Sequence, residues 1–341
     1  MSVISKFRTS FDFSIPIHWH PGHMSKSLMK MKQMINDIDL FIEIRDSRIP
    51  ISSINSEFEK MIGDKKRIVV YSRQDLAPTE SQSQLEKSLK TLGYDDFCFM
   101  NCKSLIDTDR LLNRIKKNEL KSAYGIKRSS AMVVGMPNVG KSTLLNSLRK
   151  AGVNKGKASK AGATPGLTKS LASSVRILEY PELFLYDTPG VMPPFNPNPI
   201  STLKFALTGG IKDNLLEYEI IADYLLFRLN NSGSTEYVTQ LGLQEPTDNI
   251  NELLTHVCHK IGALHKGGIP DYPTAARFFV SQYRYAKYGL FCLDDVSVEG
   301  IQKQLDEMND PSKISKNQLK KEHKKKLKER SLERYKRKMG I

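Results

Sequence analysis

The chain has 341 residues, of which 39% are hydrophobic, and it carries a formal net charge of +15. A chain of this size can bury a substantial core and is long enough for about two domains plus tails. No run of about 18 uncharged apolar residues occurs, so we expect no membrane-spanning helix, while peripheral attachment to a membrane surface stays open. The four cysteines have neither paired zinc spacing nor the density of a secreted disulfide scaffold, which favours a reducing compartment.

The amino-terminal segment is basic, rich in hydroxyl side chains and free of acidic residues before Asp12. These features are typical of a mitochondrial targeting segment, although an ordinary chain terminus fits nearly as well. We therefore treat residues 1–16 as a candidate targeting segment.

Short apolar runs separated by helical stretches follow. The runs typical of strands are residues 39–44, 67–71, 97–100, 131–134 and 183–186. A helical stretch such as residues 79–92 between two such runs predicts an α/β fold with a mostly parallel sheet and helices on both faces. Ligands in this architecture bind at the carboxyl ends of the strands, where the polar motifs described below occur.

The chain changes character at the proline-rich segment 193–199, which predicts a linker. Helical periodicity then appears without a comparable strand pattern, over residues 215–229, 250–261 and 274–287. The expected organisation is an α/β domain at residues 17–194, a small all-α domain at 195–300 and a basic tail at 301–341.

The strongest motif is Gly135-Met-Pro-Asn-Val-Gly-Lys-Ser142, which has the spacing of a phosphate-binding loop and lies between a predicted strand and a predicted helix. Its glycines let backbone N–H groups at a helix start face phosphate oxygens. We expect Lys141 to bind the β- and γ-phosphates and Ser142 to bind Mg²⁺. The residues expected to contact the nucleotide here are Pro137, Asn138, Val139, Gly140, Lys141, Ser142 and Thr143.

Two later segments would complete such a site. The loop Gly162-Ala-Thr-Pro-Gly-Leu-Thr168 offers a hydroxyl, and Asp187-Thr-Pro-Gly190 ends an apolar run. We expect Thr168 to complete the Mg²⁺ coordination and Asp187 to hold the ion through water, while Gly190 donates its backbone N–H to the γ-phosphate. Each segment by itself is a weak signal.

A guanine-reading segment is predicted at Ser72-Arg-Gln-Asp75. Asp75 can accept two hydrogen bonds from guanine, a pattern that adenine does not offer. The usual Asn-Lys pair is replaced here, so the amide is lost, while the flat guanidinium of Arg73 could still lie along the base. A second base-contacting loop is expected after the next strand. The expected base-contacting residues are Ser72, Arg73, Asp75, Asn101, Cys102 and Lys103.

The guanine-reading segment precedes the phosphate-binding loop, which reverses the order of ordinary GTPases. This order predicts a circularly permuted domain. Together with His20-Pro-Gly-His-Met24, the segment from Asp39 to Pro50 and the segment Leu207-Thr-Gly-Gly-Ile-Lys-Asp213, the motifs resemble the YlqF/RbgA family of ribosome-assembly GTPases. The similarity covers roughly residues 15–300, and the mitochondrial ribosome-associated branch looks most similar.

The resemblance implies a fold, an activity and a location. The fold would be a circularly permuted P-loop GTPase domain followed by a small helical domain that binds the ribosome or its RNA. The activity would be GTP hydrolysis coupled to maturation of the large ribosomal subunit, with hydrolysis driving release. The protein would work in the mitochondrial matrix, with peripheral contact to the inner membrane left open.

The catalyst of hydrolysis is expected to be unusual, because Val191 stands where many GTPases have a glutamine that orients water. The resemblance implies that Asn138 helps to hold a potassium ion and that His23 orients the attacking water. An alternative for His23 is a purely structural place at the start of a helix. The core stripe of that helix would be Met24, Leu28, Met31 and Ile35.

Ribosomal RNA is the expected partner. Residues 311–341 contain 13 Lys or Arg against three Glu, and such a tail suits a polyanion. A second candidate contact is a basic stripe of Arg277, Arg284 and Lys287 in the helical domain. Two other functions stay open at this point: a nonenzymatic RNA-binding factor that uses nucleotide as a structural ligand, and a P-loop ATPase or kinase, against which Asp75 argues.

Overall fold

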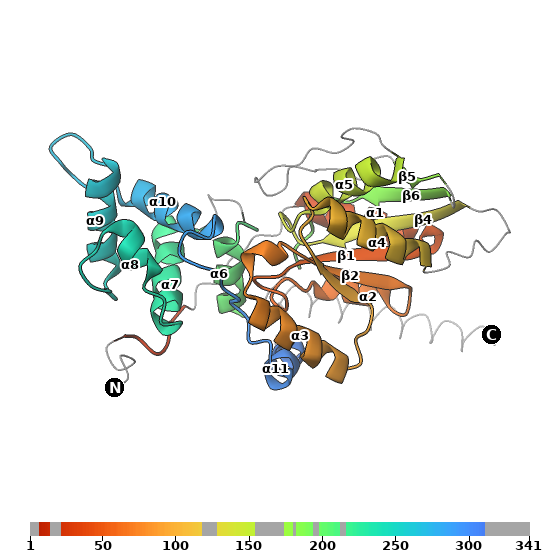
Figure 1. Ribbon diagram of the computed structural model, residues 1–341, viewed down its shortest axis with the longest axis horizontal. Helices are drawn as coiled ribbons and strands as arrows, with labels where there is room; N and C mark the ends of the chain where they lie inside the picture. Colours follow the sequence, from red (N-terminus) through yellow and green to blue (C-terminus); the bar gives the residue numbers. More distant parts are fainter. Residues whose placement is uncertain are drawn as a thin grey trace, which may run out of the picture.

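A computed structural model describes residues 7–13, 22–117, 128–153, 174–179, 182–193, 198–211 and 216–310. A sheet domain lies at one end of the molecule and a group of helices at the other, with α6 (Pro199–Leu207) between them (Figure 1). The predicted α/β class is confirmed. Within the described residues, no helix has the length and apolar character needed to cross a bilayer.

The sheet has six strands in the order β3-β2-β1-β4-β6-β5, and only the edge strand β5 runs antiparallel to its neighbour. The strands are β1 (Leu40–Asp46), β2 (Arg67–Ser72), β3 (Phe97–Met100), β4 (Arg128–Gly135), β5 (Val175–Leu178) and β6 (Glu182–Asp187). Every residue of β1 is buried, as expected for a parallel strand covered on both faces. The five predicted strands are present, and the short edge strand β5 was not predicted.

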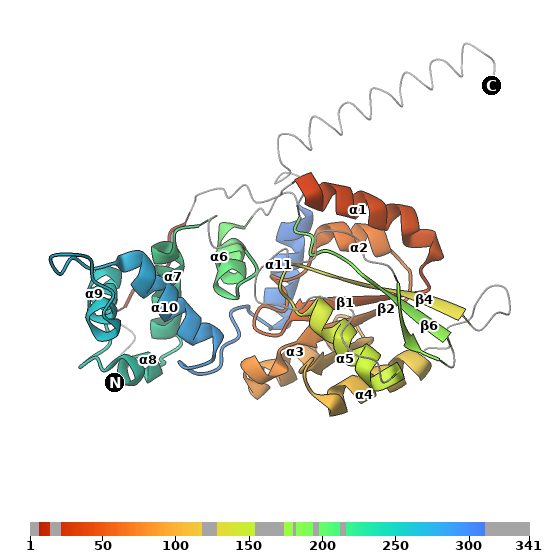
Figure 2. The same ribbon diagram turned by 90° about the horizontal axis from the view of Figure 1, so that it is seen from above.

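Helices cover both faces of the sheet (Figure 2). On one face lie α4 (Leu105–Lys117) and α5 (Lys141–Val153), and on the other lie α1 (Gly22–Met34) and α2 (Ser56–Ile62). The predicted stripe of α1 packs into the core, since Met24, Leu28 and Met31 are buried. A further helix, α3 (Thr79–Thr91), follows β2.

The helical group consists of α7 (Tyr218–Asn231), α8 (Glu236–Leu241), α9 (Ile250–Ile261) and α10 (Tyr272–Arg284). The three helices predicted in this region are confirmed. Helix α10 packs against both α7 and α9, so that apolar residues of all three form one core. Helix α7 also packs against α6, which links the helical core to the rest of the molecule.

The expected start of the tail at residue 301 falls inside a helix of the sheet domain. Helix α11 (Val298–Asn309) lies against α3 and shares a small core with it (Figure 1). Its buried Ile301 and the neighbouring Leu305 pack with Leu85 and Leu89 of α3. Apolar side chains three or four residues apart form this face, but charged residues around them obscured the pattern in the sequence. Residues 311–341 lie outside the described part of the chain.

Asp294 fixes the return of the chain to the sheet domain. Its carboxylate accepts hydrogen bonds from the backbone N–H groups of Ile51, at 2.8 Å, and Ser52, at 2.7 Å. It also pairs with the Lys204 ammonium of α6 at 2.9 Å. Burial by itself would raise the pKa of Asp294, but Lys204 and the hydrogen bonds from Ser52 hold that pKa below its ordinary value. The contact therefore joins α6 and the segment before α11 to the loop after β1.

Residues 7–13, in the middle of the candidate targeting segment, pack onto the helical group. The Arg8 guanidinium pairs with Asp223 at 2.7 Å and with Asp248 at 3.1 Å. The Phe11 ring lies 5.3 Å from that of Tyr224 in an edge-on arrangement. The predicted targeting segment 1–16 thus contains residues that help to form the helical domain.

The contribution of this segment can be measured with Phe11→Ala. Loss of a partly buried aromatic side chain is expected to lower the free energy of unfolding by about 1–2 kcal/mol. Urea unfolding of the purified protein measures the change. The matched control is Asp12→Ala at the exposed neighbouring position, with an expected change within about 0.5 kcal/mol. Equal stability of the two variants would contradict a structural role for Phe11.

Candidate nucleotide-binding site

The polar motifs meet at the carboxyl ends of β2, β4 and β6. The Ser142 hydroxyl donates a hydrogen bond to the Asp187 carboxylate at 3.2 Å, which joins the start of α5 to the end of β6. The Ser72 hydroxyl donates to the Val139 carbonyl at 2.7 Å, which joins the end of β2 to the phosphate-binding loop. Segments far apart in the sequence therefore form one site, because the strands before them run parallel in one sheet and end on the same side of it.

The phosphate-binding loop runs from Gly135, at the end of β4, to Lys141, where α5 begins. Gly135 has a φ of +154°, and an added Cβ would lie 2.6 Å from the Ile44 carbonyl oxygen of β1. Only glycine fits this position. The loop thus leaves the centre of the sheet and delivers the amino terminus of α5, whose N–H groups and dipole favour an anion.

Lys141 is held inside this loop. Its side chain is buried, and its Nζ donates a hydrogen bond to the Met136 carbonyl at 2.6 Å. Burial lowers the pKa of Lys141 to about 8, and the nearby Asp187 carboxylate opposes part of that change. A bound triphosphate would supply the negative charge that stabilises the protonated lysine.

The lowered pKa predicts a pH dependence of GTP affinity. The phosphates should raise the pKa of Lys141, so affinity should be highest below pH 8 and should fall above it, where the free protein has lost a proton that the complex keeps. Near pH 8 a part of the free lysine has lost its proton, so binding should be accompanied by net proton uptake. Calorimetry in two buffers of different ionisation enthalpy measures this uptake. Zero uptake at pH 8 would contradict the assignment.

The oxygen atoms of Ser142 and Asp187 fit a magnesium ion. Mg²⁺ prefers hydroxyl, carboxylate, water and phosphate oxygens, and it rarely sits in a cage made of protein alone. In keeping with this, the described residues contain no cluster of three or more His, Cys, Asp or Glu side chains that could hold a metal ion. Thr168, the other predicted magnesium ligand, lies outside the described residues.

The segment after β6 lies directly against the phosphate-binding loop. An added Cβ on Gly190 would lie 2.5 Å from the Cα of Pro137, so only glycine allows this approach. Val191 is completely buried, and its carbonyl accepts a hydrogen bond from the Asn55 amide at 2.7 Å. The side chain at position 191 therefore belongs to the core.

Ser72 and Arg73, which are predicted to contact a base, both bind the phosphate-binding loop. The Arg73 guanidinium donates to the Asn138 carbonyl at 2.6 Å and pairs with Asp46 at 3.3 Å. These two acceptors hold the guanidinium against the phosphate-binding loop. Through their contacts with Asn138 and Val139, both side chains bind the end of β2 to that loop.

Asp75 is exposed just beyond this contact, in the short helical turn η3 (Gln74–Leu76). The loop after β3 is held next to it by Asp107, whose carboxylate accepts from the Gln74 amide at 2.7 Å and from the Asn101 N–H at 2.9 Å. Sequence reasoning did not single out Asp107.

The other two residues of the loop after β3 differ in burial. Cys102 is buried, and burial raises the pKa of its thiol to about 12. Lys103 is exposed, and its backbone N–H donates to the Asn101 side chain at 2.9 Å. Asn101 and Lys103 can therefore reach a ligand, while Cys102 forms part of the packing.

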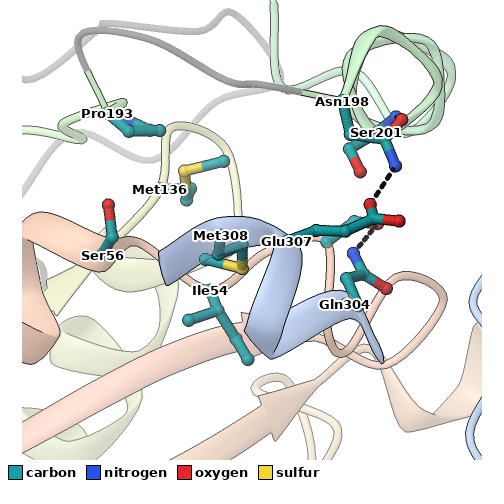
Figure 3. A pocket seen from close by; sticks show the side chains of 10 residues that line it. Ile54, Ser56, Met136, Pro193, Asn198, Ser201, Gln304, Glu307 and Met308 are labelled. Atoms are coloured by element: carbon teal, nitrogen blue, oxygen red, sulfur yellow. Dashed lines mark hydrogen bonds between the residues drawn. The ribbon is translucent and has the colours of Figure 1, made fainter. Parts of the chain in front are cut away.

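A small cavity lies behind the phosphate-binding loop, between Met136 and α11 (Figure 3). Its volume is about 40 Å³, which suits a water molecule and excludes a nucleotide. Gln304, Glu307 and Met308 of α11 line one side of it. Helix α11 therefore supports the rear of the loop.

Two predicted site residues cannot be placed. The backbone of His23 belongs to the first turn of α1, but its side chain is outside what the structure describes. The same holds for the whole of Thr168.

The basic stripe predicted in the helical domain is only partly present. Arg284 is bound to backbone carbonyls of α6, Arg277 lies over the Tyr218 ring, and Lys287 follows the end of α10. The sequence placed Arg284 in a basic stripe but did not indicate that its guanidinium binds the backbone of α6. The motif from Leu207 to Asp213 drew attention to the end of α6, but nothing in the sequence indicated that Arg284 binds there.

A phosphate-binding loop between a parallel strand and a helix, with the Ser142–Asp187 pair beside it, defines a P-loop nucleotide-binding domain, and the names of its relatives make it a GTPase. Curated relatives agree. The chain is 36% identical over 313 residues to mitochondrial ribosome-associated GTPase 1 of Ictalurus punctatus, covering 86% of this chain and 98% of that protein. It is 33% identical over 289 residues to ribosome biogenesis GTPase A of Priestia megaterium, covering 82% and 97%. The chain belongs to the family of mitochondrial ribosome-associated GTPases.

Two further comparisons agree with this family. A family profile described as "50S ribosome-binding GTPase" matches residues 130–260. The solved structure of GNP-bound YlqF from T. maritima superposes with a TM-score of 0.55 at 21% identity, covering 80% of this chain and 98% of that chain, which supports the fold. The protein is thus a mitochondrial GTPase, and the ATPase or kinase alternative is set aside.

Proposed function

We propose that this GTPase acts on the large mitochondrial ribosomal subunit during its assembly, and that GTP hydrolysis drives its release. The observation that carries the proposal is that Lys141, the Ser142–Asp187 pair and Asp75 all follow the carboxyl ends of strands in one sheet. Relatives of the chain are named ribosome-associated. The connectivity of the sheet also fits a circularly permuted domain, because β2 and its guanine-reading segment precede β4 and the phosphate-binding loop.

In this proposal the residues divide the work by their chemistry. Backbone N–H groups of residues 137–143 and the Lys141 ammonium bind the phosphates, and Asp75 reads the guanine edge. Ser142, Thr168 and Asp187 hold Mg²⁺, which neutralises charge that develops on the phosphate oxygens. The Gly190 N–H contacts the γ-phosphate, supported by its position against Pro137. The attacking water has to be oriented by a group other than the buried Val191.

Two groups are proposed to assist the attack on the γ-phosphate. One is a potassium ion held in part by Asn138, since a cation there would stabilise the developing charge. The Asn138 amide nitrogen donates to the Gly209 carbonyl at 2.9 Å, so its oxygen is the atom suited to a cation. The other is His23, whose ordinary pKa near neutrality suits an orienting or accepting role.

Ribosomal RNA is the proposed contact of the helical domain and the tail. The net charge of +10 in residues 311–341 suits RNA phosphates, and Arg277 adds an exposed cation. The start of that tail follows α11, which packs behind the phosphate-binding loop. The same charge suits the anionic inner membrane, which we include as a secondary peripheral contact.

Turnover measurements test the proposal. GTP and ATP hydrolysis should be compared with and without purified large ribosomal subunits, each in potassium and in sodium buffer. We expect multiple turnover of GTP alone, stimulated by the subunits and by potassium, and reduced by His23→Ala without loss of GTP binding. Turnover that the subunits do not change would contradict the ribosomal role, and equal rates in both buffers would contradict the potassium ion. No observation favours the nonenzymatic alternative.

A further inference from the structure

The carboxyl end of α6 is held by side chains from four separate parts of the molecule. The last turn of a helix leaves carbonyl groups without the usual helical partners. Here the carbonyl oxygens of residues 206–209, which we call the α6 carbonyl cluster, each accept a side-chain hydrogen bond. The donors are Arg284 to Ala206 at 2.9 Å and to Leu207 at 3.0 Å, Arg48 to Thr208 at 3.2 Å, Arg73 to Thr208 at 3.5 Å, and Asn138 to Gly209 at 2.9 Å.

These donors belong to different functional units. Asn138 lies in the phosphate-binding loop, Arg48 follows β1, and Arg284 is the last residue of α10 in the helical domain. Three of the four donor residues carry guanidinium groups, which the negative end of the α6 dipole favours. Arg48 is itself fixed by a buried ion pair with Asp46 at 2.8 Å. The cluster therefore bridges the nucleotide site and the helical domain through one short run of backbone.

The bridge is close-packed at Gly209. This residue has a φ of +84°, and an added Cβ would lie 3.1 Å from the Asn138 amide nitrogen and 3.5 Å from the Arg284 guanidinium carbon. The phosphate-binding loop and α10 thus approach the same glycine. A displacement of α10 relative to α6 would move the Gly209 carbonyl, to which the Asn138 amide donates its hydrogen bond.

We propose that Arg284 is a positioning residue that couples the helical domain to Asn138 through the α6 carbonyl cluster. When the helical domain binds its partner, Arg284 fixes the last turn of α6, and Gly209 then sets the orientation of the Asn138 amide beside the phosphates. By linkage, a nucleotide that reorients Asn138 changes the position of α10 in return. The part of the inference that concerns ribosomal subunits rests on the proposed function.

Arg284→Ala removes both contacts, and Arg284→Lys keeps the charge but offers one nitrogen for two carbonyls. At saturating large subunits, Arg284→Ala should lower stimulated turnover about tenfold, within the range of typical coupling between sites. Intrinsic turnover and GTP affinity should change less than about threefold, because Arg284 does not reach the phosphates. Gln282→Ala, at a half-buried position of the same helix, is the control and should keep full stimulation at saturation.

A second measurement needs no ribosome. Amide hydrogen exchange of the isolated protein should show that a nonhydrolysable GTP analogue changes protection at residues 208–211 and at the end of α10, and that Arg284→Ala removes the change at α10. Wild-type exchange and wild-type stimulation in Arg284→Ala would overturn the inference.

Arg284→Lys distinguishes a loss of coupling from a general loss of folding. It is expected to keep the wild-type unfolding midpoint and still lose stimulation about threefold or more. Full stimulation in this variant would overturn the two-carbonyl role. If subunits fail to stimulate even the wild type, the ribosomal proposal fails, and the exchange experiment still decides the inference.

Discussion

Lys141→Ala is expected to weaken GTP binding about 100-fold. Hydrogen bonds from a charged donor contribute up to about 3 kcal/mol, and each 1.4 kcal/mol corresponds to about tenfold in affinity. The lysine is held in place by the Met136 carbonyl, so its ammonium is already close to where phosphates would bind. Titration with a fluorescent GTP analogue measures the change.

The free Lys141→Ala protein should remain folded. Burial of an ammonium group is unfavourable before the nucleotide arrives, as the lowered pKa of Lys141 indicates. The matched control is Lys150→Ala, an exposed lysine at the far end of the same helix, which should bind GTP as the wild type does. An affinity loss shared by both variants would point to general electrostatics, and near-normal binding by Lys141→Ala would exclude its proposed role.

Asp75→Asn is expected to change the preferred base from guanine to xanthine. The carboxylate of Asp75 accepts two hydrogen bonds from guanine, whereas an amide offers one donor and one acceptor, which suits the N1–H and the 2-oxo group of xanthine. GTP binding should fall about 100-fold, because one donor of guanine loses its charged acceptor and meets an N–H group. XTP should become the preferred ligand. Competition between GTP and XTP for the same fluorescent probe measures the exchange.

The control for this substitution is Asp64→Asn. Asp64 is exposed in the turn before β2, at the amino end of the strand that carries Asp75 at its carboxyl end. It should bind GTP normally and gain nothing for XTP. If Asp75→Asn retained its preference for GTP, the guanine-reading role would have to pass to another residue of the loop after β3.

Several parts of this molecule could be predicted because they depend on neighbours in the sequence. The apolar runs of the main strands, the stripe of α1 and the helices of the helical domain follow from periodicity. The phosphate-binding loop follows from glycine and lysine spacing, and its start at β4 and its end at α5 agree with that pattern. Edge strand β5 was missed because it is short and alternates weakly.

The roles of the arginines could not be predicted in the same way. Arg73 could be expected beside a base, and Arg284 on a solvated stripe, because their local surroundings fit those places. In the structure Arg73 binds the carbonyl of Asn138, 65 residues away, and Arg284 binds that of Leu207, 77 residues away. An arginine carries the same donors in water and in a protein, so only the packing of distant segments decides which acceptor it meets.

The sequence by itself determined the α/β class, the phosphate-binding loop, the inverted order of its motifs and the family. The tertiary structure decided that residues 7–13 and α11 belong to the folded core, and that α6 lies between the nucleotide site and the helical domain. The physical reason is that periodicity and loop spacing are local properties of the backbone. Burial and ion pairing depend on which distant segments come into contact. The ion pair between Arg8 and Asp223 is an example.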